Sequence, residues 1–330
     1  MNNPIETPSI INNLNFSYFL SFAMITGIKL DIFTELSKSS KNVDELATNL
    51  NLNAGKLLLL LYMLVNAQLM KVDNGIFTNT DETNKFLVRD NPGYIGGFIS
   101  MMLGSIQKTE ETIRTGKPQS KLDFETLPED ILFKIFQGLH TGALKIGIEL
   151  AARLNLFQYK HLLDVAGGSG GLAIGIYQSC SDIKATIVEL PTIASITRKF
   201  ISESNMSNRI NIIECDLVKK APEGIYDIAI MHHFIQVLSP NMAREAIKNI
   251  YDALEPGGTL YIIGKILNDS HLSPAQSVAF NLVFINTYDE GQAFTEKEYI
   301  EWIKEAKFVD ININNNIPPN GEAIITARKL

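Results

Sequence analysis

The segment Asp164-Val-Ala-Gly-Gly-Ser-Gly-Gly171 carries the most structural information in this 330-residue sequence. A β-rich run, residues 161–166, leads into the glycines, and a helical pattern follows them. Glycines at a turn from a strand into a helix let a ligand approach the backbone, and the N-terminus of the helix then faces that ligand. The segment therefore predicts a ligand site at the carboxyl end of a strand.

Outward from this segment, β-rich runs alternate with helical stretches through the second half of the chain. Such alternation predicts a mostly parallel sheet, and two final runs around the turn Pro318-Pro-Asn-Gly321 predict an antiparallel last strand. We therefore expect an α/β fold with a Rossmann-like sheet of seven strands. The predicted strands are residues 161–166, 185–190, 210–214, 226–231, 259–263, 309–313 and 323–327.

Two classes of ligand fit the glycine turn. The pattern Gly168-x-Gly170-x-x-Ala173 is compatible with a dinucleotide site, in which Glu189 at the end of the next strand would accept from a ribose. Three features favour S-adenosylmethionine instead: Asp164 lies within the strand before the glycines, Asp216 ends the third strand, and the sheet closes with an antiparallel hairpin. The sequence thus favours S-adenosylmethionine over NAD.

Each of these residues offers a physical role toward that cofactor. Small residues at Gly167, Gly168 and Gly170 let the amino-acid end approach the backbone. Asp164 can balance the ammonium charge, Glu189 can accept from two ribose hydroxyls, and Asp216 can accept from the adenine amino group. The alternative is that all three acids are ordinary solvated residues at strand ends.

The first third of the chain predicts a winged helix. Apolar residues recur at three- and four-residue steps between Phe16 and Phe33, which indicates a helix with one apolar face. Asn42-x-x-Glu45 predicts a capped helix, and Asn53 caps a second helix that runs to about residue 70. A hairpin turn follows at residues 72–77.

This winged helix has more apolar surface than a small domain can bury. The run Leu57 to Val65 is unbroken, so we expect a buried helix there, beside the apolar face of residues 16–33. We therefore predict that residues 1–108 form a dimerisation domain and that the protein is a homodimer.

The charges argue against a DNA-binding regulator, which is the first alternative for a winged helix. The chain has 29 Lys+Arg and 36 Asp+Glu, a net charge of −7, and residues 1–108 hold eight bases and nine acids. A helix that reads a DNA groove needs basic or amide side chains, whereas Leu57 to Val65 is apolar. We expect neither nucleic acid nor membrane as a partner.

Location is predicted from two further features. No basic segment precedes the apolar N-terminal residues, so we expect neither an export signal nor a membrane span. Cys180 and Cys215 cannot make a disulfide framework and lack the neighbours of a zinc site. We expect a cytoplasmic protein without a metal ion.

The chain resembles the family of small-molecule O-methyltransferases that includes caffeate, acetylserotonin and many bacterial natural-product enzymes. The resemblance rests on Phe16-x-x-x-Leu20, on Asp164-x-x-Gly-Gly-x-Gly170, on residues 251–258 and on residues 294–299. It implies a homodimer with interlocking N-terminal domains, connecting helices at residues 109–157 and a class I methyltransferase domain at residues 158–330. The cofactor contacts that it implies are Asp164, Gly167, Gly168, Gly170, Glu189, Leu190, Asp216, Leu217 and His232.

The sequence departs from that family at the catalytic base. A gap-free comparison of Met231-His-His-Phe-Ile-Gln-Val-Leu238 places Gln236 at the position of the catalytic histidine, and the two glutamates that orient this histidine fall on Gly264 and Ala293. An amide can orient a substrate but cannot accept its proton. A phenol, with a pKa of about 10, would need another base.

His233 and His140 are the candidates for that base. His233 would face away from His232 if the strand continued, so that one of the pair faces the cofactor. The resemblance places His140 on the long helix of residues 131–154, where relatives line the methyl-transfer pocket. For both, the alternative is a hydrogen-bonded packing histidine.

Together these features predict an S-adenosylmethionine-dependent methyltransferase of a small molecule. O-methylation without the usual histidine base is the first expectation, and S- or C-methylation remains open. A family member that binds the cofactor but catalyses another reaction is a further alternative. The apolar stretch from Phe280 to Ile285 is expected to form substrate-pocket walls and dimer contacts, although core packing explains it equally well.

Overall fold

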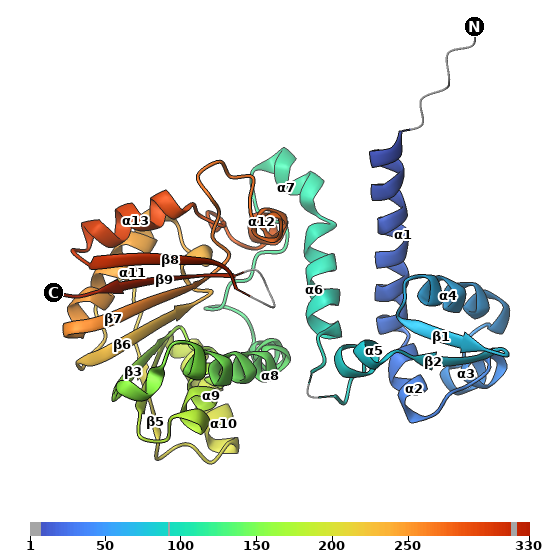
Figure 1. Cartoon of the computed structure of the whole chain (residues 1–330), viewed down its shortest axis with the longest axis horizontal. Coiled ribbons are helices and arrows are strands. Elements are labelled where there is room, and N and C mark those ends of the chain that lie inside the picture. Colours follow the sequence, from blue (N-terminus) through green and yellow to red (C-terminus); the bar gives the residue numbers. More distant parts are fainter. Residues whose placement is uncertain (1–7, 92, 318–321) are drawn as a thin grey trace, which may run out of the picture. The chain divides into compact units, whose positions relative to one another are not determined.

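The structure is a computed structural model that describes residues 8–91, 93–317 and 322–330. The chain divides into two compact units, residues 1–103 and 104–330, and the division falls within helix α6 (Gly96–Ile106) (Figure 1). The predicted domain limits of 1–108, 109–157 and 158–330 stay proposals. Each unit is described by itself.

The N-terminal unit contains the predicted helices and hairpin. The predicted capping box is confirmed: the Asn42 side chain accepts from the Glu45 N–H at 2.9 Å, and Glu45 accepts from the Asn42 N–H at 3.0 Å. Asn53 caps the next helix through the Lys56 N–H at 2.9 Å. The elements are α1 (Ser9–Lys29), α2 (Ile32–Lys38), α3 (Val43–Leu50), α4 (Ala54–Asn66), β1 (Met70–Asp73), β2 (Ile76–Asn79) and α5 (Asp81–Phe86).

The spacing of the apolar residues 16–33 predicted one helix, and this prediction is wrong. The helix is interrupted between α1 and α2, where Asp31 adopts a left-handed φ of 59°. The Phe33 ring then folds back onto Gly27, where a methyl group would lie 2.9 Å from the ring. Ala23 on α1 and Phe33 on α2 lie on either side of this bend and are buried in the same core.

Within the single chain, α4 is buried on one face only. Leu57, Leu61 and Leu64 are buried, whereas Leu59 and Tyr62 are more than half exposed, so the prediction of a fully buried helix is wrong for the isolated chain. The first half of α1 is also exposed, and its exposed apolar residues are Ile10, Ile11, Leu14, Phe16, Tyr18, Phe19 and Phe22.

In the C-terminal unit, helices and turns precede the sheet. The unit begins with the end of α6, and α7 (Thr109–Thr115) and α8 (Glu129–Arg153) follow. Asn286 binds α7 to the helix α12 (Ala275–Thr287): its side chain accepts from Thr112 at 2.6 Å and donates to Thr109 at 2.8 Å. Long-range packing of this kind leaves no local signal in the sequence.

The sheet has seven strands in the order β5-β4-β3-β6-β7-β9-β8, and β9 alone runs in the direction opposite to the other six. The predicted mostly parallel sheet with an antiparallel last strand is confirmed, while the predicted turn at residues 318–321 lies outside the described residues. The strands are β3 (His161–Val165), β4 (Lys184–Glu189), β5 (Ile210–Glu214), β6 (Tyr226–His232), β7 (Leu254–Gly264), β8 (Val309–Ile317) and β9 (Glu322–Arg328).

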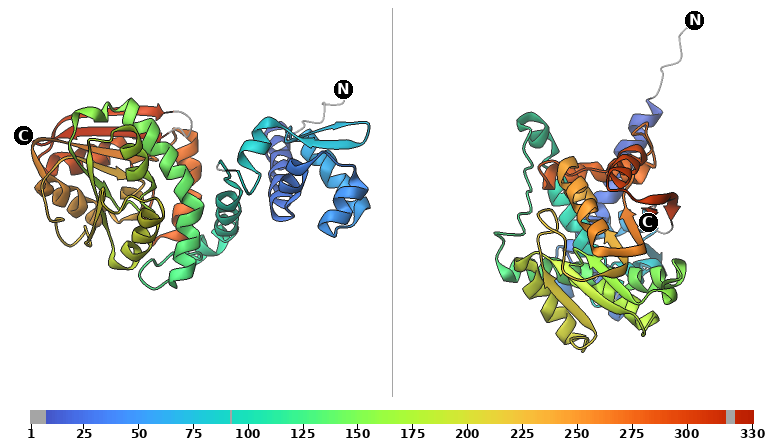
Figure 2. Two further views of the ribbon diagram at one scale, coloured as in Figure 1. Left: turned by 90° about the horizontal axis from the view of Figure 1, so that it is seen from below. Right: turned by 90° about the vertical axis from the view of Figure 1, so that its left-hand side faces the viewer.

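Helices cover both faces of this sheet (Figures 1 and 2). Alternate residues of each strand enter opposite cores, as Leu163 and Leu162 do. One core contains α11 (Pro240–Ala253) and α13 (Glu296–Glu305), and the other contains α8, α9 (Gly171–Ser179) and α10 (Pro191–Glu203). Two short 3-10 helices, η1 (Leu156–Gln158) and η2 (Ile235–Val237), complete the unit.

The strand order creates a switch point between β3 and β6. β4 lies on one side of β3, and β6 lies on the other after a crossover from the edge strand β5. The alternating pattern predicted a helix between β5 and β6, but residues 215–225, all of them described, contain turns instead. In doubly wound sheets a ligand binds at such a switch point, outside the carboxyl ends of the strands.

Among the described residues, no single helix is both long and apolar enough to cross a membrane. The helices α1 and α2, bent by 63° at their junction, reach that length and composition only as a pair.

Candidate active site

The glycine segment forms a tight turn directly after β3. Ala166, Gly168 and Gly170 have left-handed φ values of 52°, 57° and 73°, and Gly170 is the N-cap residue of α9. At Gly167 a methyl group would lie 2.7 Å from an oxygen of Asp164. At Gly167, Gly168 and Gly170 the neighbouring side chains thus leave no room for a Cβ atom, and the positive φ values of Gly168 and Gly170 favour glycine as well.

Asp164 is a buried acid, and one of its carboxylate oxygens lacks a hydrogen-bond partner among the described residues. Its side chain is 1% exposed, the Ala173 backbone hydrogen-bonds the carboxylate, and Oδ2 has no partner in the described part of the chain. Burial, together with the charge of Glu189, raises the pKa of Asp164 to about 7. A cation at this position would favour the ionised form of Asp164.

Glu189, at the end of β4, holds the glycine turn. Its Oε1 accepts from the Gly168 N–H at 2.7 Å, and its Oε2 accepts from the Leu190 N–H at 3.0 Å. Burial raises the pKa of Glu189 to about 7 against the effect of these two bonds. The sequence suggested a ribose acceptor, and the turn-holding role was not foreseen. A carboxylate oxygen has two lone pairs, so each can still accept a ligand hydroxyl.

Asp216 and Leu217 follow β5 at the same edge of the sheet. The Asp216 carboxylate pairs with Lys219 Nζ at 2.7 Å and accepts from the Val218 N–H at 3.1 Å. Leu217 is buried, and its carbonyl accepts from the Asn249 amide at 2.7 Å. The structure therefore brings the predicted acids of three consecutive strands to one edge.

Helix α8 lies against the glycine turn through aromatic side chains. A methyl group at Gly168 would lie 2.8 Å from the Phe136 ring, and His140 Nδ1 hydrogen-bonds Ser169 Oγ at 2.9 Å. His140 also stacks on Phe200, with 4.8 Å between ring centroids, and burial lowers its pKa. Sequence reasoning included His140 but missed Phe136, whose apolar character alone gives no functional signal.

The carboxyl end of β6 carries a polar cluster: His232, His233, Lys265 and Glu322. His233 Nε2 lies 2.9 Å from Glu322 Oε1, and His232 Nε2 lies 3.9 Å from Glu322 Oε2. Lys265 Nζ lies 3.9 Å from Glu322 Oε1. The expectation that the two histidines face opposite ways is wrong, because the strand ends at His232 and His233 turns to a left-handed φ of 54°.

Electrostatics inside this cluster favour an ionised Glu322. Burial opposes ionisation, but the two imidazoles facing the carboxyl outweigh it and hold its pKa well below the usual range. Burial and the neighbouring His233 lower the pKa of His232, and burial lowers that of Lys265. Sequence reasoning missed Glu322, because it lies 89 positions from His233 on a strand whose place in the sheet no local pattern gives.

Gln236 lies in η2 with its side chain 1% exposed. Its Nε2 has no hydrogen-bond partner among the residues that the structure describes, and a methyl group at Gly264 would overlap that nitrogen. The glycine at the end of β7 thus leaves the space that the carboxamide of Gln236 occupies. Ala293, the other small residue expected near Gln236, is buried before α13.

The site fits S-adenosylmethionine on its own geometry. The partnerless, buried Asp164 oxygen is the acceptor that an ammonium group would satisfy, and the adjacent Gly167 leaves room for no side chain. The acids at the ends of β4 and β5 follow at the same edge.

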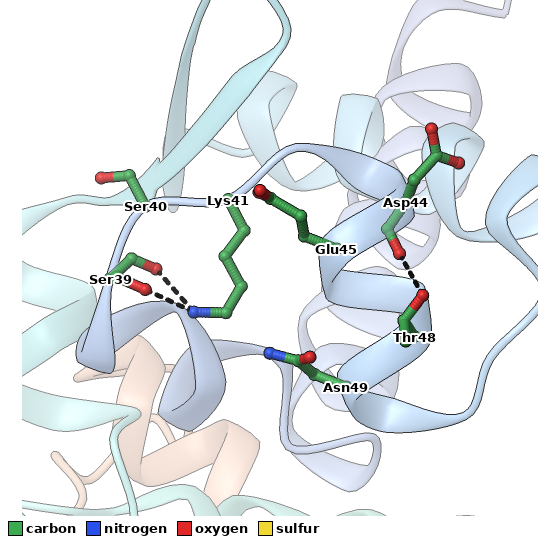
Figure 3. A pocket seen from close by; sticks show the side chains of 7 residues that line it. All are labelled: Ser39, Ser40, Lys41, Asp44, Glu45, Thr48 and Asn49. Carbon is green, nitrogen blue, oxygen red and sulfur yellow. Dashed lines mark hydrogen bonds between the residues drawn. The ribbon is translucent and has the colours of Figure 1, made fainter.

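A shallow hollow in the N-terminal unit is not part of this site (Figure 3). It has a volume of about 510 Å³, and its polar groups serve local structure: Lys41 donates to the Ser39 carbonyl at 3.3 Å, and Glu45 closes the helix cap. The lining residues are Ser39, Ser40, Lys41, Asp44, Glu45, Thr48 and Asn49.

Known proteins share both parts of the chain. The family model of the O-methyltransferase domain matches residues 126–309, and that of the O-methyltransferase dimerisation domain matches residues 12–89. The tetracenomycin polyketide synthesis 8-O-methyl transferase TcmO of Streptomyces glaucescens is 23% identical over 97% of each chain. PigF, an S-adenosyl-L-methionine-dependent methyl transferase of a Serratia strain, is 24% identical over 91% of this chain and 90% of its own.

A solved structure shows the same fold over the whole length. Human N-acetylserotonin methyltransferase in complex with SAM superposes with a TM-score of 0.85 at 19% identity, covering 99% of each chain. The O-methyltransferase model alone spans more than half of the present sequence. The chain therefore belongs to the O-methyltransferase family, as an S-adenosylmethionine-dependent methyltransferase of small molecules with a dimerisation domain of its own.

Proposed function

We propose that this enzyme methylates a hydroxyl group on an aromatic small molecule. The observation that carries the proposal is the partnerless, buried oxygen of Asp164 beside the glycine turn, within a chain of the O-methyltransferase family. TcmO is an 8-O-methyl transferase of tetracenomycin polyketide synthesis, and its similarity to this chain supports an aromatic acceptor.

The cofactor contacts are proposed at the carboxyl edge of β3, β4 and β5. When bound, S-adenosylmethionine supplies an electrophilic methyl group on a sulfonium sulfur. Asp164 pairs with the ammonium group, Glu189 accepts from the ribose while it holds the glycine turn, and Asp216 accepts from the adenine. The further contacts that we propose are Gly167, Gly168, Gly170, Leu190, Leu217 and His232.

The acceptor side is proposed to be apolar, with one buried amide. Phe280 and Phe284 of α12 pack edge to face, with 5.1 Å between ring centroids, and join a cluster with Leu267 and Ala293. An aromatic acceptor gains from burial against such walls. Gln236, whose Nε2 lacks a partner within the described residues, is proposed to stand where the family has its catalytic histidine and to orient the acceptor as a hydrogen-bond donor.

His140 is proposed as a positioning residue. Its bond to Ser169 and its stack on Phe200 tie α8 to the glycine turn, so the helix holds the turn in the shape that the cofactor needs.

We further propose a homodimer in the cytoplasm. The dimerisation domain exposes Phe16 and Phe19 of α1 and Leu59 of α4, each about half exposed or more, and a second copy of this chain would cover them. The two buried free cysteines are compatible with a reducing compartment.

Label transfer tests the proposed function. The protein is incubated with methyl-labelled S-adenosylmethionine and a panel of phenols, naphthols and hydroxyanthraquinones, and mass spectrometry locates the added methyl group. A methyl ether supports O-methylation, whereas a methyl group on carbon or sulfur supports the C- or S-transfer alternatives. Cofactor consumption without methyl transfer would support a different reaction. Asp164→Asn is the control, and we expect it to lose cofactor binding.

A further inference from the structure

The polar cluster at the end of β6 has no role in the contacts assigned so far beyond His232. It lies at the switch point, since β6 neighbours β3, which leads into the glycine turn. His233 is its most accessible imidazole, with the side chain 35% exposed, while the side chains of Lys265 and Glu322 are about one-tenth exposed. His233 is therefore the imidazole of this cluster that is most accessible from outside the protein.

The hydrogen bond to Glu322 fixes the tautomer of His233. An ionised carboxylate only accepts, so Nε2, at 2.9 Å from Glu322 Oε1, carries the proton and donates it. Nδ1 of the neutral ring then has a free lone pair. A histidine held in this way by a carboxylate is the arrangement of a general base.

The backbone also singles out this position. His233 has a φ of 54°, and its N–H donates to the Ile263 carbonyl at 2.9 Å, which extends the pairing of β6 with β7. A left-handed conformation is costly for a residue other than glycine and is retained where the surroundings impose it. Here it turns the imidazole toward Glu322 and away from the direction that a continued strand would give.

The residues of this cluster suit proton transfer better than the binding of a metal ion. The ligand atoms of His232, His233 and Glu322 lie within 4.8 Å of one another, a spacing that a metal ion could use. Lys265 Nζ, however, lies 3.9 Å from Glu322 Oε1 and already supplies a positive partner, which would repel a divalent ion. The charged or titratable groups that face His233 are thus His232, Lys265 and Glu322.

We propose that His233, positioned by Glu322, is the general base of this enzyme, a role that Gln236 cannot fill. This assignment rests on the proposed O-methylation. As the acceptor oxygen forms its bond to the methyl carbon, its hydroxyl proton passes to His233 Nδ1. The carbon–sulfur bond breaks, and its electron pair stays on sulfur, so the positive charge moves from the sulfonium to the imidazolium, which then releases the proton to water.

The variant His233→Asn tests the base while it preserves the backbone. Asparagine tolerates a left-handed φ but cannot accept a proton. Two acceptors are compared at about pH 8: 2-naphthol, which is mostly protonated, and 4-nitrophenol, which is mostly ionised. We expect kcat/KM for 2-naphthol to fall by roughly 100-fold or more, and that for 4-nitrophenol by far less, because an ionised acceptor needs no base.

A matched control exists in the same unit. His271 is exposed and also has a left-handed φ, of 63°, so His271→Asn repeats the chemical change without touching the cluster. We expect wild-type rates for this control. Equal losses for both phenols in His233→Asn, or an unchanged rate with 2-naphthol, would overturn the assignment of the base.

Glu322→Gln tests the positioning of the imidazole. In wild type, kcat/KM for 2-naphthol should depend on pH, and Glu322→Gln should shift that dependence. Nitrogen NMR of histidine-labelled protein gives a reading that is independent of turnover: His233 should be protonated at Nε2 and bare at Nδ1. A proton on Nδ1 of the neutral ring would refute the proposal.

The two proposals fail in different ways. Absence of methyl transfer by wild type to every phenol of the panel removes the proposed O-methylation. Transfer that persists in His233→Asn, with 2-naphthol and an unchanged pH profile, leaves O-methylation standing and removes only the base.

Discussion

Gly147 on α8 and Gly175 on α9 face each other where the two helices cross. A methyl group at Gly147 would overlap the Leu172 carbonyl oxygen, and one at Gly175 would overlap the Leu144 carbonyl oxygen. Each added methyl group would also lie 3.1 Å from the Cα of the opposite glycine. Because α9 begins at the glycine turn, this crossing sets the position of α8 over the candidate site.

We predict that Gly175→Ala destabilises the C-terminal unit. The clash is with backbone, which cannot rotate away, so the helices must separate at a cost of about 1–3 kcal/mol. Urea unfolding followed by circular dichroism measures the change. Gly142→Ala is the matched control: it lies on α8 with no described atom near its added methyl group, and it should raise the stability by up to about 1 kcal/mol through helix propensity. Equal stability of the two variants would contradict the close crossing.

We predict that Glu189→Gln weakens the binding of S-adenosylhomocysteine. An amide leaves only one acceptor atom for the Gly168 and Leu190 N–H groups and the ribose, and the loss of a charge-assisted hydrogen bond is worth about 1.5–3 kcal/mol. Calorimetry measures the affinity. The control is Glu214→Gln, which pairs in register with Glu189 on the next strand but has a partly exposed side chain bound to Arg198. Equal affinity for both variants would mean that Glu189 has no part in the site.

In the ligand-free protein, Asp164 and Glu189 should contribute a loss of stability as the pH rises from about 4 to 7. In that window these two side chains bind more protons in the folded chain than in the unfolded chain, because their pKa values are raised to about 7 from ordinary values of about 4. Thermal melting between about pH 5 and 8 measures the slope, and Asp164→Asn should flatten it. An identical slope in that variant would show that the pair does not titrate in this window.

We predict that Phe19→Asp splits the proposed dimer. A charge on the exposed apolar part of α1 would have to be buried against the second copy, at a cost of several kcal/mol. Light scattering should give about twice 36.7 kDa for wild type and about 36.7 kDa for the variant. Asn12→Asp, which adds the same charge at another exposed position of α1, is expected to remain dimeric. A monomeric wild type would reject the proposal.

Gln236→Leu should make the fold more stable and the enzyme slower. Removing a buried donor without a partner among the described residues relieves about 1–3 kcal/mol of desolvation, while loss of the acceptor's hydrogen bond lowers turnover by roughly 10- to 100-fold. Melting temperature and kcat are measured on the same preparation. Undiminished kcat would assign Gln236 to packing alone.

Local patterns predicted much of this fold. The Asn42 capping box, the Asn53 cap and the strands around Asp164 involve residues a few positions apart, so the sequence shows them directly. The bend at Asp31 escaped prediction because it depends on Phe33 packing back onto Gly27, a contact that apolar spacing does not distinguish from a straight helix.

In the candidate site, too, some residues could be predicted from the sequence and others could not. Asp164 and Glu189 stand out in the sequence as strand-end acids near a glycine turn, and the structure places both side chains beside that turn, while their contacts with the cofactor stay a proposal. Glu322 was missed because its meeting with His233 depends on the order of strands in the sheet. The imidazoles of His232 and His233 both face Glu322 because His233 has a left-handed backbone conformation. Histidine adopts this conformation too rarely for the sequence to predict it.

The position of β9 gives this fold an order of assembly. β8 precedes β9 in the chain, yet β9 pairs with both β7 and β8, and β8 pairs with β9 alone. During synthesis on a ribosome, β8 therefore leaves the exit tunnel ahead of β9, and it can join the sheet only after β9 has paired with β7. Since Glu322 opens β9, the proposed base acquires its carboxylate partner in the same late event. We expect nascent chains that stop before β9 to hold the glycine turn and yet to lack the proton-transfer half of the site.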